Sequence, residues 1–371
     1  MSQKRPQPDA FIAARVAKLR AAMVERKVPA LLVTSFADVS YLTGFEGDDS
    51  FALVTPEQFV LVSDSRYEEQ ISRECPWVEA VIRRKGIILE VGKLLKRLRI
   101  TRLGVQAESM TLRQHESLRG EFKGKTAPRI VPVADLVVAL RHIKDEREIA
   151  LTEQAIAIAE HGFETLKAHL KVGMTENEIA SLLVHEMRKR GALNASFDTI
   201  VAAGANGSLP HYRPGAVALQ NNMPLLIDWG ARFAGYVSDL TRVVFFGRVP
   251  RVIEDIYGVV LEAQMAAIDA IKPGKTAREI DRVARGIIKK AGYGKQFGHG
   301  LGHGIGRDIH EAIALNATSK IKLEPGMIVT VEPGIYLPGV GGVRIEDDVL
   351  ITATGCRVLS RLPKTLESAR L

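Results

Sequence analysis

A repeated helix signature in the second half of the chain constrains the fold more than any other feature. The segment Gly173-Met-Thr-Glu-Asn-Glu-Ile179 recurs 101 residues later as Gly274-Lys-Thr-Ala-Arg-Glu-Ile280. Both copies contain Thr-x-x-Glu, the capping box that opens an α-helix, and both predicted helices stop at a glycine, Gly191 and Gly292. These glycines are again 101 residues apart, so the pattern predicts two similar α/β halves related by a pseudo-twofold axis.

Each half continues into an apolar hairpin that carries two acidic residues. In the first half, Asp228 and Asp239 are equally far from the centre of the predicted turn. In the second half, Glu332 and Glu346 are symmetric about Gly339 in the same way. Like charges across a hairpin repel, and apolar neighbours increase that cost. We therefore expect a cation to offset the acids of both hairpins.

Two divalent ions carry the positive charge that four carboxylates require. A set of four carboxylates and one histidine is rich in oxygen and suits Mn²⁺, Co²⁺, Fe²⁺ or Zn²⁺ better than a metal that prefers thiolates. Paired metal ions about 3.5–4 Å apart hold a bridging hydroxide, which is a nucleophile near neutral pH. The alternative, ordinary surface carboxylates, leaves the mirrored placement of the four acids unexplained.

A glycine- and histidine-rich stretch, Gly298–Glu311, supplies the histidines of such a site. It contains His299, His303 and His310, which is one third of the nine histidines of the chain. Glycine allows other groups to approach the backbone closely, so the stretch predicts a ligand-lined bend and not a packed helix. By itself the pattern fits a flexible loop with incidental histidines equally well.

The N-terminal part predicts a separate α/β module. Residues 11–27 show helical periodicity, and short buried strands are predicted at 30–33, 51–54 and 59–62, the last two joined by a turn at Pro56. The module has no cluster of titratable groups, so we expect it to cap, dimerise or shape a site located elsewhere. We predict two domains, residues 1–140 and 141–371.

Composition narrows the class of protein. The chain is 46% hydrophobic and 25% charged, it has no run of about 18 apolar residues, and its N-terminus does not resemble a signal peptide. Cys75 and Cys356 are isolated thiols, which favours a cytoplasmic location. The net charge is +8, and residues 83–129 hold thirteen Lys/Arg against four Asp/Glu. These basic residues are scattered among apolar ones with little aromatic interleaving, so we interpret them as solvated faces and expect no nucleic acid and no membrane partner.

Several segments together resemble the metallopeptidase family with the pita-bread fold, which includes methionyl aminopeptidase, aminopeptidase P and prolidase. The segments are 228–239, 302–311, 331–335 and 343–347, and Tyr41-Leu-Thr-Gly-Phe45 resembles the creatinase-type N-terminal domain. The resemblance covers essentially the whole chain. It implies an α/β (α+β) protein, with a small α/β N-terminal domain and a pseudo-twofold pita-bread catalytic domain.

The resemblance also implies a role for each residue of the metal site. Asp228 would hold one of two divalent ions (Mn, Co or Zn), and His303 with Glu332 would hold the other. Asp239 and Glu346 would bridge the pair. Glu332 would in addition carry a proton to the leaving amine.

Further residues match family positions that contact the substrate. His211 and His310 match histidines that contact the scissile amide and stabilise the tetrahedral state. His299 and Arg344 match substrate-binding positions of the proline-specific members. At Ala314, however, many prolidases have an arginine.

The expected activity is hydrolysis of the peptide bond preceding proline, by an Xaa-Pro aminopeptidase or an Xaa-Pro dipeptidase. The proline specificity comes from the resemblance alone. A creatinase-like amidinohydrolase and a non-catalytic binding protein on the same scaffold are the alternatives, and the full set of five metal ligands argues against both. Family members are commonly homodimers, so a homodimer that binds peptides is expected.

Overall fold

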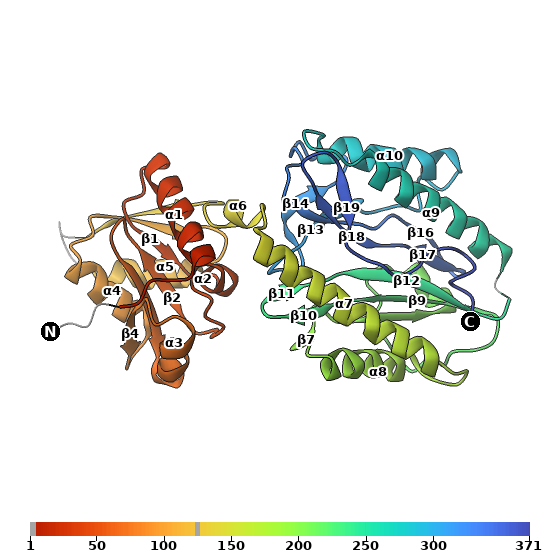
Figure 1. The fold of residues 1–371 in the computed structure, drawn as a ribbon, viewed down its shortest axis with the longest axis horizontal. Helices are drawn as coiled ribbons and strands as arrows, with labels where there is room; N and C mark the ends of the chain where they lie inside the picture. The colour runs from red at the N-terminus through yellow and green to blue at the C-terminus, as the bar shows by residue number, and fades with distance from the viewer. Residues whose placement is uncertain (1–4, 123–126, 249) are drawn as a thin grey trace. The chain divides into compact units, whose positions relative to one another are not determined.

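The computed structural model describes residues 5–122, 127–248 and 250–371. The chain divides into two compact units, Met1–Arg141 and His142–Leu371 (Figure 1). The division falls one residue after the boundary predicted from the sequence. We refer to these as the first and the second unit.

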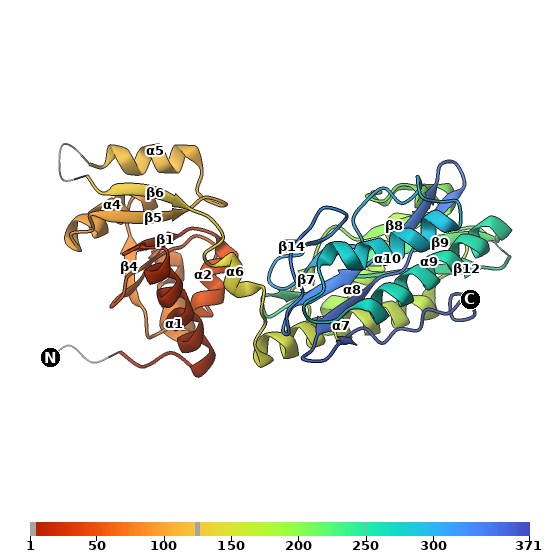
Figure 2. The same ribbon diagram turned by 90° about the horizontal axis from the view of Figure 1, so that it is seen from above.

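The first unit is a six-stranded mixed sheet with the strand order β4-β3-β2-β1-β5-β6 (Figure 2). Its strands are β1 (Leu31–Val33), β2 (Phe51–Val54), β3 (Phe59–Asp64), β4 (Glu79–Arg83), β5 (Arg102–Gln106) and β6 (Arg129–Val133). Its helices are α1 (Ala10–Glu25), α2 (Phe36–Thr43), η1 (Ser65–Tyr67), α3 (Glu68–Glu74), α4 (Ile87–Arg97), α5 (Leu112–Gly120) and α6 (Val138–Arg141). The predicted hairpin is confirmed, because β2 and β3 pair antiparallel with Phe51 opposite Val62.

Side chains on alternate positions of the sheet enter two different cores, because successive strand residues point to opposite faces. Along β1, Leu31 and Val33 pack with residues of α1 and α2. Leu32 packs on the other face with residues of α4 and α5. Helices therefore cover both faces of this sheet.

The second unit contains two helix pairs that confirm the predicted repeat. They are α7 (Glu146–His169) with α8 (Glu176–Lys189), and α9 (Arg251–Ala270) with α10 (Ala277–Lys290). Both α8 and α10 open with a capping box in which the threonine hydroxyl accepts from the third backbone N–H and the glutamate accepts from the threonine N–H. Both helices end just before a glycine with left-handed φ, 99° at Gly191 and 92° at Gly292. In Figure 1, α8 lies below the strands and α10 lies above them, whereas α7 crosses in front of the lower strands.

The strands of the second unit form small sheets with the orders β11-β10-β7, β12-β9-β8, β14-β13-β15-β18-β19 and β16-β17. Their bounds are β7 (Asn194–Ala195), β8 (Ile200–Ala203), β9 (Met223–Trp229), β10 (Ala231–Phe233), β11 (Tyr236–Val237), β12 (Leu240–Phe246), β13 (Gly302–Gly304), β14 (Glu311–Leu315), β15 (Ile328–Val331), β16 (Gly334–Leu337), β17 (Gly341–Arg344), β18 (Asp347–Ile351) and β19 (Cys356–Val358). The short helix η3 (Gly204–Ser208) follows β8.

The register of the first hairpin differs from the prediction. Strands β9 and β12 pair Asp228 with Thr241, not with Asp239. The turn consists of Ala234 and Gly235, which have φ values of 46° and 79°, and its centre lies one residue later than the symmetric placement assumed. The prediction that the two aspartates face each other directly was therefore wrong. Asp239 is two residues from Thr241, so it lies on the same face as Asp228 as a diagonal neighbour.

The second hairpin has the predicted register. Strands β15 and β18 pair Val331 with Asp347, and β16 and β17 pair Gly334 with Arg344. Both pairings are symmetric about Gly339, so they place Glu332 opposite Glu346. Because both glutamates lie in short breaks between paired strands, their side chains are available to a site between the hairpins.

Candidate metal centre and active site

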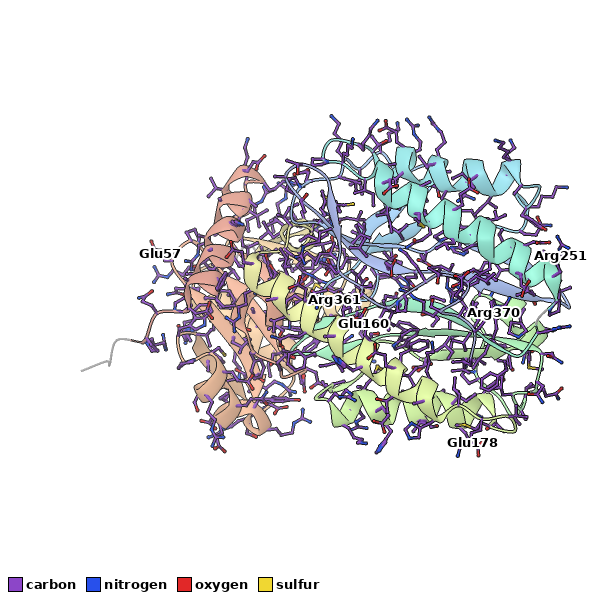
Figure 3. The ribbon with its side chains drawn as sticks, turned by 45° about the vertical axis from the view of Figure 1, so that its right-hand side comes forward. Glu57, Glu160, Glu178, Arg251, Arg361 and Arg370 are labelled. Atoms are coloured by element: carbon purple, nitrogen blue, oxygen red, sulfur yellow. The ribbon has the colours of Figure 1, made fainter. Side chains whose placement is uncertain are left out.

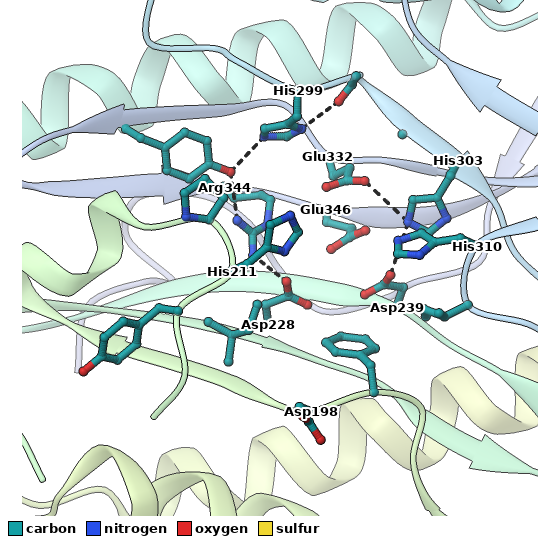
Figure 4. Close-up of a pocket in the computed structure, with 18 of the residues that line it drawn as sticks. Asp198, His211, Asp228, Asp239, His299, His303, His310, Glu332, Arg344 and Glu346 are labelled. Atoms are coloured by element: carbon teal, nitrogen blue, oxygen red, sulfur yellow. Dashed lines mark hydrogen bonds and ion pairs between the residues drawn. The ribbon is translucent and has the colours of Figure 1, made fainter. Parts of the chain in front are cut away.

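A cavity of about 580 Å³ in the second unit brings together every residue that the sequence analysis placed in the site. Its lining includes His211, Asp228, Asp239, His299, His303, His310, Glu332, Arg344 and Glu346. Figure 4 shows these side chains converging from the two hairpins, the histidine-rich stretch and the segment after η3. The candidate site is therefore assembled from both halves of the repeat.

His303 is held in β13 with one ring nitrogen directed at the acids. The backbone N–H of His303 donates to Thr330 Oγ1 (3.0 Å), and the ring atom Nδ1 contacts the carbonyl oxygen of Gly304 (3.1 Å). A carbonyl only accepts, so the proton is assigned to Nδ1 and Nε2 carries the free lone pair. Nε2 lies 3.5 Å from both Asp239 Oδ2 and Glu332 Oε1. The strand approaches so closely that a Cβ on Gly302 would lie 2.0 Å from Thr330 O.

The acids of the site are buried with unused oxygen atoms. Among the described residues, Asp228 Oδ1, Asp239 Oδ1 and Glu346 Oε1 have no hydrogen-bond partner. Buried polar atoms in proteins almost always have one, so three such oxygens in one cavity require a further ligand. Ligand atoms of Asp239, His303 and Glu346 all lie within 4.8 Å of one another. Hard oxygen donors with one imidazole fit a divalent cation.

The electrostatics of the site lead to the same conclusion. Burial raises the pKa of Asp239 and of Glu346 well above the ordinary range, and the neighbouring acids raise both further. Burial also raises the pKa of Glu332 to about 7, against the opposing effects of His303 and Arg344. The acids repel one another when all are ionised, and divalent cations would remove that penalty.

Arg344 compensates part of this charge by direct contact. It is 3% exposed, its Nη2 forms an ion pair with Asp228 Oδ2, and its Nε donates to Thr241 Oγ1 (3.1 Å). Its Nη1 donates to the hydroxyl of Tyr336 (2.8 Å). The guanidinium group therefore fixes the orientation of Asp228, the residue of β9 that lines the cavity.

Tyr336 connects Arg344 to His299. The Nδ1 atom of His299 contacts Gly300 O (2.7 Å), and its Nε2 contacts the Tyr336 hydroxyl (2.9 Å). Because Nδ1 must donate to the carbonyl, Nε2 accepts from Tyr336, and the imidazole is neutral. Burial, with the nearby Arg344 charge, lowers the pKa of His299 to about 4, in agreement with this tautomer.

His310 stands beside His303 just before β14. The two rings are 4.3 Å apart, edge to face, and burial together with His303 and His211 lowers the pKa of His310. The next residue, Glu311, forms a buried ion pair with Lys144 (2.8 Å), and Glu311 Oε1 accepts the N–H of Arg307 (3.1 Å). This pair fixes the strand start that carries His310.

The comparisons with known proteins agree with this site. A model of metallopeptidase family M24 matches residues 150–353, and a model of the creatinase/prolidase N-terminal domain matches residues 15–143. The chain belongs to metallopeptidase family M24.

Similar proteins cover nearly its whole length. The chain is 38% identical to an uncharacterized peptidase of Bacillus subtilis, YqhT, over 352 residues, or 95% of this chain and 99% of the relative. A solved Xaa-Pro dipeptidase from Bacillus anthracis is 38% identical, with a TM-score of 0.92, and the match covers 97% of this chain and 100% of the dipeptidase. An X-Pro aminopeptidase from Thermotoga maritima MSB8 is 36% identical, with a TM-score of 0.85 and coverage of 92% and 98%.

Membership of family M24 establishes a metal-dependent peptidase with the pita-bread fold that acts on peptides. The family implies divalent metal ions, and the cluster of Asp239, His303 and Glu346 is a candidate place for them. In the described ranges, none of the helices combines the length and the apolar character that crossing a bilayer requires.

Thr241 and Tyr336, which bind side chains of this M24 site, were not predicted from the sequence. Thr241 donates its hydroxyl to Glu346 Oε2 (2.6 Å), and it follows Asp239 by two residues, so strand alternation was a usable signal. Tyr336 gave no such signal.

The bulky side chain of Trp229, adjacent to Asp228, points away from the cavity. It is fully buried, its ring stacks on that of Phe163 (4.4 Å between centroids), and its Nε1 donates to Ala159 O.

Proposed function

We propose that this M24 peptidase hydrolyses the peptide bond preceding proline, as an Xaa-Pro aminopeptidase or an Xaa-Pro dipeptidase. The observation that carries the proposal is the set of three buried carboxylates, the half-buried Glu332 and His303 in one cavity, with three carboxylate oxygens unpartnered among the described residues. Support for proline specificity comes from the two similar enzymes, one an Xaa-Pro dipeptidase and the other an X-Pro aminopeptidase.

The proposed metal site has two divalent ions, Mn, Co or Zn, matching the charge of four carboxylates. Asp228 would hold one ion, His303 and Glu332 would hold the other, and Asp239 and Glu346 would be shared between the two. When bound, paired divalent ions polarise the scissile carbonyl and lower the pKa of water to supply a nucleophile near neutral pH. The unpartnered oxygens of Asp228, Asp239 and Glu346 support this ligand set.

The protein residues around these ions have separate proposed roles. Glu332 would take a proton from the attacking water and give it to the leaving amine. His310 and His211 donate hydrogen bonds to the oxyanion that forms at the scissile carbonyl. His299 and Arg344 contribute to the substrate pocket, with Arg344 also orienting Asp228 through their ion pair.

The proposal extends to the organisation of the protein. Each chain consists of a creatinase-type N-terminal domain (residues 1–140) and a catalytic domain (residues 141–371). Two such chains form a homodimer in the cytoplasm. The division of the structure after Arg141 supports the boundary. Sedimentation of the purified protein at several concentrations tests the dimer, and a monomer throughout would refute it.

A peptide panel tests the function. The protein, loaded with Mn²⁺, Co²⁺ or Zn²⁺, is assayed with Xaa-Pro and Xaa-Pro-Yaa peptides and with matched peptides in which alanine replaces proline. We expect cleavage before proline at least tenfold faster than before alanine. Equal rates would refute proline specificity, cleavage of creatine would favour the amidinohydrolase, and metal binding without any turnover would favour a binding protein.

A further inference from the structure

The two halves of the repeat differ at one fully buried position. Glu176 and Ala277 each follow the capping threonine of their helix, 101 residues apart, and each is 0% exposed. Burying alanine needs no polar partner, whereas burying an ionised carboxylate costs several kcal/mol unless hydrogen bonds replace its water. A local reason must therefore exist for a carboxylate in the first half.

The carboxylate of Glu176 accepts four hydrogen bonds from a single loop. Its Oε1 accepts from the N–H of Ala203 (2.8 Å) and from Asn206 Nδ2 (2.9 Å). Its Oε2 accepts from the Tyr212 hydroxyl (2.8 Å) and from the N–H of Gly215 (3.0 Å). Asn206 Nδ2 also donates to Tyr212 Oη (2.9 Å), which closes the network. We call residues 203–215 the anchored loop.

These contacts exceed what is needed to attach a loop to the start of a helix. In both halves, a backbone N–H group in the first turn of the helix already binds a carbonyl of the loop that packs against it. Asn177 N donates to Gly215 O (3.1 Å), and its repeat counterpart Arg278 N donates to Ser319 O (3.2 Å). The second half manages with such backbone bonds and Ala277. The four bonds to Glu176 are therefore an addition specific to the first half.

The anchored loop carries His211, which lines the cavity. His303 lies in β13 and His310 directly precedes β14, so strand pairing fixes both. His211 lies outside any strand, between two residues that Glu176 binds, Asn206 and Tyr212. We infer that Glu176 is a positioning residue that holds His211 at the cavity wall through Tyr212 and Asn206.

The catalytic consequence rests on the role proposed for His211. A misplacement of about 1 Å at a catalytic group costs about 100-fold in rate. Glu176→Gln keeps the shape of the side chain but presents an amide N–H₂ group to two of the four donors. We expect kcat to fall about 10- to 100-fold, with little change in KM and an unchanged metal content.

A double-mutant cycle separates positioning from general damage. In the His211→Ala background, Glu176→Gln should cause no further loss of kcat, because the group that it positions is absent. Glu178→Gln is the matched control: it lies on the same helical turn, at the edge of the second unit (Figure 3), and binds Thr175 but not the anchored loop. We expect the control to lower stability without lowering kcat. Multiplicative losses in the double variant, or an equal loss of kcat in the control, would overturn the inference.

Two further measurements keep the test decisive. Tyr212→Phe removes only one donor to the carboxylate, so it serves if Glu176→Gln does not fold, and it should show the same coupling to His211. In protein labelled at histidine, the His211 ring signal, assigned by its absence in His211→Ala, should shift or broaden in either variant while the signal of exposed His185 stays unchanged. An unchanged His211 signal refutes the positioning role whether or not the protein cleaves Xaa-Pro bonds. A wild-type protein that cleaves no such bond refutes only the proposed function.

Discussion

Glu332 offers a quantitative test of the charge balance in the metal site. Burial raises its pKa from an ordinary 4.5 to about 7 in the protein without metal. The native state therefore holds a proton that the unfolded chain has already released. By linkage, stability falls as pH rises through this window, because the native state binds more protons than the unfolded state does.

The size of the effect follows from the two pKa values. A difference of about 2.5 between unfolded and native states corresponds to about 3 kcal/mol, since each pKa unit is worth about 1.4 kcal/mol. Glu332→Gln removes this penalty. In metal-free protein, the free energy of unfolding of the variant relative to wild type should therefore increase by about 2–3 kcal/mol between pH 5 and pH 8. Groups that do not interact with Glu332 cancel in this comparison, including His299, whose lowered pKa acts in the opposite direction below pH 6.5.

The assay is urea unfolding of chelator-treated protein at pH 5, 6, 7 and 8, followed by circular dichroism. Glu279→Gln is the control: the hydrogen bonds from Thr276 lower the pKa of Glu279 to about 2, so it is ionised in both states throughout this range. Its difference from wild type should be constant with pH. With added metal, wild type should be more stable to urea than Glu332→Gln, because the variant has lost a ligand and gains less stability from binding the metal. A pH-independent difference for Glu332→Gln in metal-free protein would refute the reasoning.

Three further predictions concern the site. Asp239→Ala should abolish activity and lower the metal content measured by mass spectrometry, since a bridging ligand serves both ions; full metal content with activity would contradict the assignment. His310→Ala should keep its metal and lose about 10²–10³ in kcat, the usual effect of one oxyanion donor, and loss of metal would instead make His310 a ligand. Xaa-Pro-Yaa peptides should be cleaved at least as well as Xaa-Pro, because Ala314 replaces the arginine that binds a dipeptide carboxylate in many prolidases and Arg344 is engaged with Asp228. A strong dipeptide preference in kcat/KM, measured on peptides that share the first two residues, would show that another cation binds this carboxylate.

Features that depend on neighbours along the chain were predictable from the residues alone. The capping boxes and terminal glycines located both ends of α8 and α10, because a helix end is satisfied by residues within one turn of it. Local spacing also predicted the register of the second hairpin, which is symmetric about Gly339, and the four acids that line the cavity. These are patterns of residue type at short separation, and the fold preserves them.

Pairings between residues far apart in the chain depend on how the elements pack, and no prediction reached them. Two consecutive positive φ values moved the centre of the first turn by one residue and so changed the partner of Asp228. Arg344 meets Asp228 across 116 residues, and Glu176 meets Tyr212 across 36. A buried charge accepts whichever donors packing brings to it, and no spacing in the sequence specifies that choice. The roles of Tyr336, Thr241 and Glu176 in forming the site therefore became visible only in the folded chain.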